Sequence, residues 1–129
     1  MPITARNILF IFISLLMIVD LETLVPGIGR YTAGAIASIA YNIKTPIVDG
    51  NITRVISRLR SLNSDSKSKQ SIHQQWLLAE QLVDCERPGE FNQALMELGA
   101  LVCTSRNPEC MKCPIEKHCI VKRRVYRRQ

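Results

Sequence analysis

Apolar residues recur every three or four positions over most of the chain after residue 20. This spacing puts them on one face of a helix, and no stretch shows the sustained alternation that marks a half-buried strand. Four apolar stripes are predicted: Ala33, Ile36, Ala37 and Ala40; Ile52, Val55, Ile56 and Leu59; Ile72, Trp76, Ala79 and Val83; and Phe91, Ala94, Leu95 and Leu98. The pattern predicts an all-α fold, and 129 residues suffice for one modest core.

Local composition sets the limits of these helices. The small residues of segment 32–40 predict a helix that approaches a neighbour closely. The polar, Ser-rich segment 61–70 is predicted to be an exposed connector, with Ser71 as the N-cap of the next helix. The single tryptophan, Trp76, is expected in the core rather than as a platform for stacking a base.

The first twenty residues follow a different pattern. Residues 8–19 are apolar except for Ser14, and this run is shorter than the ~20 residues that span a bilayer. Its length also suits a secretory signal, although no small-residue cleavage site follows it. A targeting or anchoring segment, a buried helix and a misplaced gene start or alternative exon all stay open.

Charge adds a candidate partner. Lys and Arg number 17 against 11 Asp and Glu, which gives a net charge of +6. Five cations crowd the last nine positions: Lys122, Arg123, Arg124, Arg127 and Arg128. This balance favours a polyanionic partner, nucleic acid before a membrane surface, and the alternative is a merely solvated basic tail.

Four of the five cysteines share one short segment, with the spacing Cys103-x6-Cys110-x2-Cys113-x5-Cys119. Such clustering indicates a metal site in a reducing compartment rather than a disulfide scaffold. The spacing favours an iron–sulfur cluster, and structural zinc stays open because four thiolates also satisfy a tetrahedral site. Cys85 lies outside the pattern and is expected to be a small buried or half-buried thiol.

A turn of two glycines precedes the small-residue helix. Leu24 and Val25 lead into Pro26-Gly27-Ile28-Gly29, after which Arg30 and Tyr31 start a helix. Without a Cβ in the way, backbone N–H groups and the helix start can point at a phosphate oxygen. The turn has the form of a helix-hairpin-helix motif, with Arg54 and Arg58 on the next helix also able to face phosphates.

Asp49 follows an apolar approach and stands directly before Gly50 and a predicted helix that begins near Asn51. An Asp in this place is most simply an N-cap that accepts a helix N–H bond. A carboxylate at the same point can also stabilise positive charge that develops on a sugar ring, and the two roles are compatible.

The order of hairpin, Asp, helix and four-cysteine loop resembles the helix-hairpin-helix DNA glycosylases that carry a [4Fe–4S] loop. Tyr31 stands where the endonuclease branch of that family has a Schiff-base Lys, and Asp49-Gly50-Asn51 is similar to the adenine-excising branch. The segment QLVDCERPGEFNQALMELGALVC resembles the same branch almost residue for residue. The resemblance covers about residues 21–124.

The resemblance implies a partial glycosylase fold with four regions: an unrelated apolar segment (1–20), the hairpin region (21–100), the cluster loop (101–120) and a basic tail (121–129). It implies catalytic roles for Asp49, Tyr31 and Asn51, a [4Fe–4S] cofactor, and duplex DNA with A·8-oxoguanine or A·G mispairs as partner. The implied function is adenine excision in base-excision repair, in the nucleus or mitochondrion, or in the cytoplasm of a bacterium.

One part of the family pattern, the general-acid segment, has no counterpart here. The family's general-acid Glu lies in a helical segment upstream of the hairpin, and residues 1–20 do not resemble that segment. We therefore expect these 129 residues to bind duplex DNA but to excise adenine near the background rate. The alternative hypothesis is a non-catalytic DNA-binding module. A third hypothesis is a membrane-tethered or secreted protein, with residues 8–19 as its targeting segment.

Overall fold

The computed structural model describes residues 16, 18–62, 65 and 67–127, and within them it contains helices and no strand. Residues 18–24 are helical and lead into the first turn. The longer helices are α2 (Arg30–Ala35), α3 (Gly50–Arg60), α4 (Lys69–Leu82), α5 (Pro88–Glu97) and α6 (Ile120–Tyr126). Two π-helical turns continue α2 and α5, η1 (Ile36–Ala40) and η2 (Leu98–Val102), and two 3₁₀ turns lie in the cysteine loop, η3 (Cys110–Lys112) and η4 (Glu116–His118). The predicted all-α class is confirmed.

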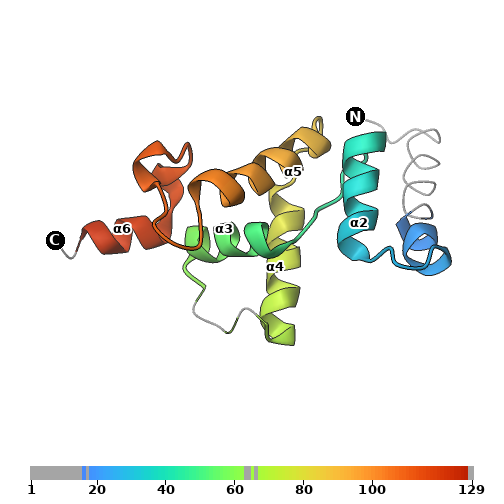
Figure 1. Cartoon of the computed structure of the whole chain (residues 1–129), viewed down its shortest axis with the longest axis horizontal. Coiled ribbons are helices and arrows are strands. Elements are labelled where there is room, and N and C mark those ends of the chain that lie inside the picture. Colours follow the sequence, from blue (N-terminus) through green and yellow to red (C-terminus); the bar gives the residue numbers. More distant parts are fainter. Residues whose placement is uncertain (1–15, 17, 63–64, 66, 128–129) are drawn as a thin grey trace, which may run out of the picture.

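Helix α3 is the centre of the arrangement. It contacts α4, α5, η2 and α6, whereas η1, the continuation of α2, packs against α5. Figure 1 shows α2 and α6 at opposite ends of the long axis, with α3 and α4 between them. The cysteine loop and α6 therefore lie at the C-terminal end of α3, and the two-glycine turn lies toward the other end.

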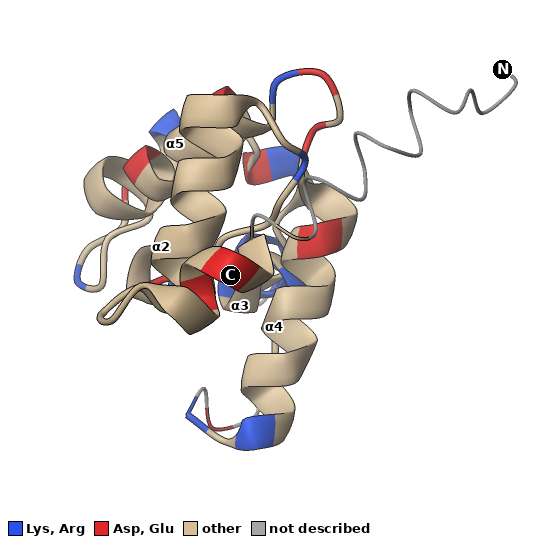
Figure 2. Ribbon diagram, turned by 90° about the vertical axis from the view of Figure 1, so that its right-hand side faces the viewer, with Lys and Arg blue, Asp and Glu red and all other residues tan. Residues whose placement is uncertain are grey.

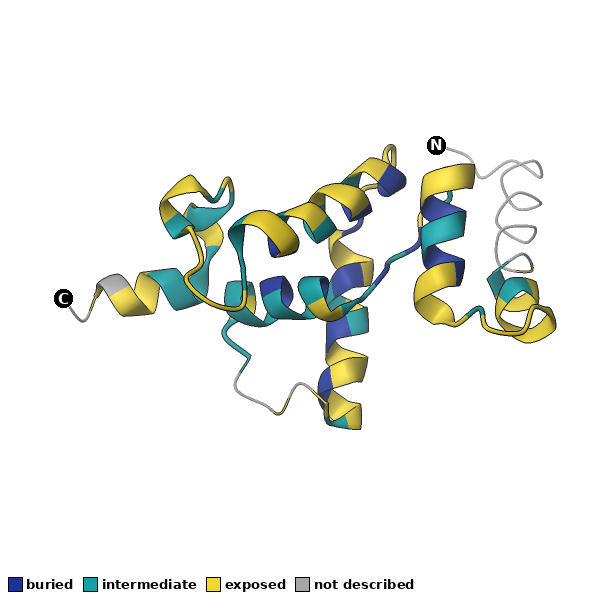
Figure 3. Cartoon of the chain, in the orientation of Figure 1, coloured by how far each residue is buried: buried dark blue, intermediate teal, exposed yellow. Residues whose placement is uncertain are grey.

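The core forms around the apolar face of α3, as the spacing predicted. Ile52 and Ile56 are fully buried and pack with Ile47 and Ala79, and Figure 3 shows the buried residues where α3 and α4 meet. The approach segment, residues 41–49, passes through this core through Ile47 before it reaches Asp49. The start of α3 is therefore fixed by packing on its N-terminal side.

The small-residue helix approaches its neighbours closely, which confirms the prediction. Ala33 and Ala37 are fully buried. A Cβ on Gly89 of α5 would lie 2.5 Å from the Ser38 carbonyl oxygen, and one on Gly34 would lie 2.8 Å from the Pro46 carbonyl oxygen. Only a residue without a side chain allows these backbones to come so near, so both contacts depend on glycine.

Helix α4 differs from its prediction in where it starts and in what it buries. It begins at Lys69, and its N-cap is Ser68, whose side chain accepts a hydrogen bond from the Ser71 N–H. Ile72 is exposed, and the buried stripe consists of Ser71, Gln75, Ala79 and Val83. The buried Gln75 is tolerated because its Oε1 accepts a hydrogen bond from Thr53 Oγ1 on α3 at 2.9 Å.

Three further predictions about burial are wrong. Ala40, the last residue of the small-residue stripe, is exposed. Ala94 is exposed, because α5 turns Pro88, Gly89 and Asn92 inward instead. Cys85 is exposed rather than buried, in the short connection between α4 and α5. Trp76 is half-buried and only in part a core residue.

Most of the apolar run 8–19 lies outside the described residues. Of its described members, Leu16 and Val19 are exposed. Among the helices that the structure describes, none has the length and apolar character needed to cross a membrane.

Candidate functional site

The two-glycine turn is exposed and its backbone is open. Gly27 has a φ of +83°, which favours glycine, and the Ile28 N–H donates to the Val25 carbonyl to close the turn. A Cβ on Gly27 or Gly29 would meet nothing within 4 Å. Gly29 is the N-cap of α2 and supplies no side-chain cap, so the N–H groups at this helix start are left for another acceptor.

The first residues of α2 tie this turn to the rest of the fold. The Arg30 guanidinium lies 3.9 Å from the centre of the Trp76 ring on α4. Tyr31 donates from its hydroxyl to the Met96 sulfur on α5 at 3.1 Å. The turn is thus held from two sides by side chains that directly follow it, and Trp76 has a partner that periodicity alone did not predict.

Asp49 is the N-cap of α3, as predicted. Its Oδ1 accepts a hydrogen bond from the Ile52 N–H at 2.7 Å, and its carbonyl oxygen accepts one from the Thr53 N–H. The residue is half-buried, and no donor among the described residues bonds to Oδ2. One carboxylate oxygen therefore fixes the side chain while the other is left for a positive charge.

Arg54 does not extend outward toward a phosphate backbone in this structure. Its Nε donates to the Cys103 carbonyl at 2.8 Å, and its Nη2 donates to the Gly99 carbonyl and to Asn51 Oδ1. Asn51 is therefore engaged with Arg54 at the start of α3. Gly99 packs directly on Asn51, since a Cβ there would lie 2.8 Å from the Asn51 carbonyl oxygen.

Arg58, one helical turn further along α3, also points into the cysteine loop. Its Nη1 donates to the Thr104 carbonyl at 2.6 Å and lies 3.4 Å from Cys103 Sγ, and its Nη2 donates to the Ser105 carbonyl. The prediction that both arginines face phosphates thus differs from their observed contacts. Charged side chains in the middle of a helix usually face solvent. No sequence signal indicated that the carbonyl groups of η2 and of the residues after it would lie beside these two arginines.

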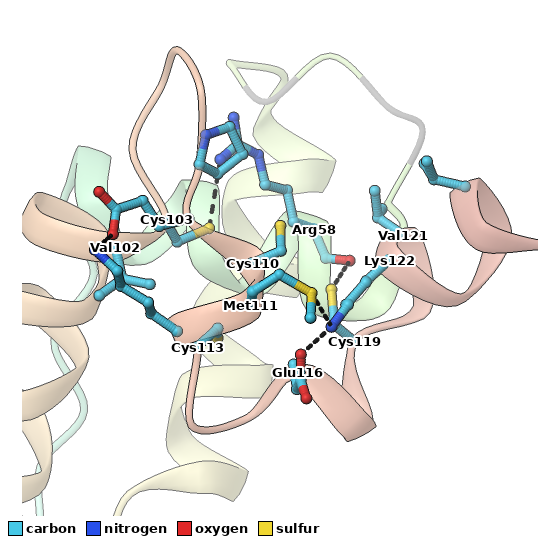
Figure 4. Close-up of a pocket in the computed structure, with 14 residues that line it drawn as sticks. Arg58, Val102, Cys103, Cys110, Met111, Cys113, Glu116, Cys119, Val121 and Lys122 are labelled. Carbon is cyan, nitrogen blue, oxygen red and sulfur yellow. Dashed lines mark hydrogen bonds and ion pairs between the residues drawn. The ribbon is translucent and has the colours of Figure 1, made fainter.

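The four clustered cysteines line one cavity of about 680 Å³, at the end of α3. Figure 4 shows them around this space together with Arg58, Glu116 and Lys122. Cys119 donates from its thiol to the Arg58 carbonyl at 3.6 Å, and Lys122 forms an ion pair with Glu116 across the rim. All four cysteines are half-buried and free of disulfides.

The electrostatics of this cavity reflect four thiols in one place. Burial raises the pKa of the Cys113 thiol, a backbone hydrogen bond at Ile115 opposes this, and the other three cysteines raise it further. Within the described residues, no group of three or more His, Cys, Asp or Glu side chains is arranged to hold a metal ion. The donor set itself, four thiols on a loop of irregular turns, fits a thiolate-bound group of several atoms.

Comparison with known proteins gives a consistent family. The chain is 54% identical over 109 residues to adenine DNA glycosylase of Homo sapiens, which is 84% of this chain and 20% of that protein. It is 54% identical to the enzyme of Arabidopsis thaliana over 74% of this chain and 15% of the relative. The chain thus spans only 15–20% of the length of these curated relatives. No protein-family model matches it.

Solved structures show the same fold. A thermostable thymine-DNA glycosylase superposes with a TM-score of 0.66 at 35% identity, over 77% of this chain and 45% of that one. A non-covalent endonuclease III–DNA complex superposes with a TM-score of 0.62 at 24% identity, over 85% of this chain and 49% of that one. The matched residues of this chain are therefore homologous to adenine DNA glycosylases, and the fold is that of the helix-hairpin-helix DNA glycosylases.

Proposed function

We propose that this chain supplies the hairpin, carboxylate and iron–sulfur part of a monofunctional adenine DNA glycosylase of base-excision repair. The observation that carries the proposal is the construction of α3. Asp49 caps its N-terminal end beside the approach segment, and Arg54 and Arg58 of the same helix hold the cysteine loop. The likeness to adenine DNA glycosylases over most of the chain supports the same conclusion.

The reaction breaks the bond between adenine and deoxyribose, and water supplies the new hydroxyl on the sugar. Positive charge develops on the sugar ring as the base departs, and the negative charge of the Asp49 carboxylate stabilises it. Tyr31 and Asn51 are proposed to stand near this centre, as in the family. The hydrogen bond from Ile52 to Oδ1 keeps the carboxylate in one orientation, which removes the need to reorganise it during the reaction.

The hairpin is proposed to position the DNA. Pro26, Gly27, Ile28, Gly29 and Arg30 form an exposed turn whose N–H groups can bond a phosphate oxygen without reading base sequence. The contacts of Arg30 with Trp76 and of Tyr31 with Met96 hold this turn in place before DNA arrives. Such preorganisation reduces the cost of binding.

Cys103, Cys110, Cys113 and Cys119 are proposed to hold a [4Fe–4S] cluster. When bound, the cluster supplies a redox-active group that also fixes the fold of the loop. Arg58 Nη1 lies 3.4 Å from Cys103 Sγ, so its positive charge would stand beside the negatively charged ligands of a bound cluster.

The substrate is proposed to be adenine mispaired with 8-oxoguanine or guanine. The alternative function is a non-catalytic DNA-binding module that keeps the hairpin and the cysteine loop. Both functions require DNA binding, so excision of adenine is the measurement that separates them.

The experiment is a chimera in which the matched residues of this chain replace the corresponding segment of human adenine DNA glycosylase. We expect the chimera to excise adenine from an A·8-oxoguanine duplex in single-turnover assays, and more slowly from an A·T duplex. Asp49→Asn should abolish excision while leaving DNA binding intact, because it keeps the Oδ1 acceptor but removes the charge. A folded chimera that binds the duplex and excises nothing would favour the non-catalytic module.

A further inference from the structure

Helix α2 and its continuation η1 carry apolar residues on two opposite sides. The inner side is fully buried through Ala33 and Ala37. On the other side, Thr32, Ile36 and Ile39 follow one another at helical spacing, and we call them the outer face of α2 and η1. Ile36 is half-buried and Ile39 is 44% exposed. A helix that is apolar on opposite sides is typically covered on both, so the outer face lacks a complete cover among the described residues.

Little charge is available on this helix to keep such a face in water. Arg30, at its first position, is the only charged residue between residues 30 and 40. Figure 2 shows the ribbon of α2 in the tan of uncharged residues. Exposed apolar surface is costly in water, so the outer face favours an apolar partner.

The helical residues before the two-glycine turn also have two unequal sides. Within residues 18–24, only Ile18 and Leu21 are half-buried, and they lie three positions apart on one side of the helix. Leu16 and Val19 are exposed, as are the charged residues of this segment. The side with Ile18 and Leu21 is therefore the side that faces the rest of the protein.

The turn determines how these two helices are paired. Only the turn separates the helical residues 18–24 from α2, and a connection this short joins antiparallel neighbours. Each helix rises ~1.5 Å per residue, so equal steps away from the turn pair Ile18 with Ile36. The same count pairs Leu15 with Ile39. Ile18 and Ile36 are both half-buried, which agrees with this register.

We propose that residues 8–17 of this chain cover the outer face: they continue the helix of residues 18–24 and pack antiparallel along α2 and η1. Except for Leu16 they lie outside the described residues, and their sequence supports the proposal. Ile11 and Leu15 extend the stripe of Ile18 at spacings of four and three, and residues 8–19 contain no Lys, Arg, Asp or Glu. The contact steadies α2 and, with it, the turn directly before α2.

The covalent link through the turn favours this segment over a second copy of the chain. A segment tethered by a short connection is present at an effective concentration of about millimolar, well above that of a separate molecule in dilute solution. A bilayer matches the run less well, because the run is shorter than the ~20 residues that span one. The outer face and the apolar run can thus meet without a second molecule.

Amide hydrogen exchange of the 129-residue chain tests the contact. The amides of residues 11–17 should exchange at least about tenfold more slowly than those of an unstructured chain, because a packed helix shields its backbone hydrogen bonds. Ile39→Glu should lower this protection about tenfold or more, because the contact would have to bury an unpaired carboxylate. The matched control is Leu77→Glu on α4, since Leu77 is also 44% exposed. The control should change the protection by less than about threefold.

A second pair of variants keeps the test independent of any loss of folding in Ile39→Glu. Leu15 is predicted to face Ile39, whereas its neighbour Leu16 is 57% exposed. Leu15→Glu should lower the protection of residues 11–17 about tenfold or more, and Leu16→Glu by less than about threefold. Circular dichroism checks that each variant is folded.

Four results would overturn the proposal. Amides of residues 11–17 that exchange as in an unstructured chain would mean that the segment does not pack. Equal losses within either pair of variants would mean that the outer face and the predicted register are not involved. Protection that rises with chain concentration and accompanies a dimer in sedimentation would assign the outer face to a second copy. Protection that appears only with phosphatidylcholine vesicles would assign the apolar run to a membrane surface.

Discussion

Asn92 should be one of the most sensitive positions for stability, although it is polar and lies far from the chemistry. Its side chain is 2% exposed. Nδ2 donates to Ser38 Oγ at 3.0 Å and to the Thr45 carbonyl at 2.9 Å. One amide therefore joins α5 to η1 and to the approach segment that delivers Asp49.

The cost of Asn92→Ala follows from these two bonds. Each contributes about 0.5–1.5 kcal/mol net, and a buried acceptor left unpaired costs about 1–3 kcal/mol. We expect a total loss of about 2–4 kcal/mol, a large part of the ~5–15 kcal/mol that stabilises a typical domain. For a chain of this size the melting temperature should fall by about 10 °C.

The assay is urea and thermal unfolding of the 129-residue chain followed by circular dichroism. Gln93→Ala is the matched control, because Gln93 is the next residue of the same helix and is exposed. The control should change stability by less than ~0.5 kcal/mol. If Asn92→Ala were as stable as Gln93→Ala, the reasoning that this amide holds the approach segment would be refuted.

Three further predictions test the site. Gly27→Val should destabilise the chain by about 1–2 kcal/mol because the φ of Gly27 is +83°. Gly29 has a φ of −92° and open space around it, so Gly29→Val should keep the stability of the chain and weaken duplex binding. Equal stability of the two variants would contradict this reasoning. Trp76→Leu should weaken duplex affinity about two- to fivefold because it releases Arg30 from an exposed cation–π contact of ~0.5–1 kcal/mol. An unchanged affinity would show that this contact does not position Arg30 for DNA. Arg58→Met should speed the loss of iron to a chelator severalfold relative to Arg60→Met, because Arg58 bonds the cysteine loop and Arg60 has no such contact among the described residues. Equal rates in the two variants would show that the Arg58 contact is unimportant.

The sequence predicted the elements whose signals are local. The stripe Ile52, Val55 and Ile56 is buried as expected, and Asp49 caps α3 because a short acceptor before a helix has few other roles. The close approach of the small-residue helix also followed from residue size alone. The sequence signal for each of these features is local, although the residues that pack against them come from other helices.

The features that sequence did not predict depend on distant partners. Gln75 is buried because Thr53 supplies its hydrogen bond, and no helical period indicates which polar residue will find such a partner. Arg54 and Arg58 were assigned to DNA because charged residues on a helix usually face outward. Their observed acceptors lie about 45 residues later, where η2 ends with free carbonyl groups.

The metal content of the purified 129-residue chain tests the central claim most directly, because only this chain's residues are needed to hold the cluster. Anaerobically purified protein should be yellow-brown and contain about four iron atoms per chain. Cys110→Ser should lose most of that iron, whereas Cys85→Ser, which changes an exposed cysteine outside the loop, should retain it. Stoichiometric zinc without iron, or iron content unchanged by Cys110→Ser, would contradict the assignment of Cys103, Cys110, Cys113 and Cys119 as cluster ligands.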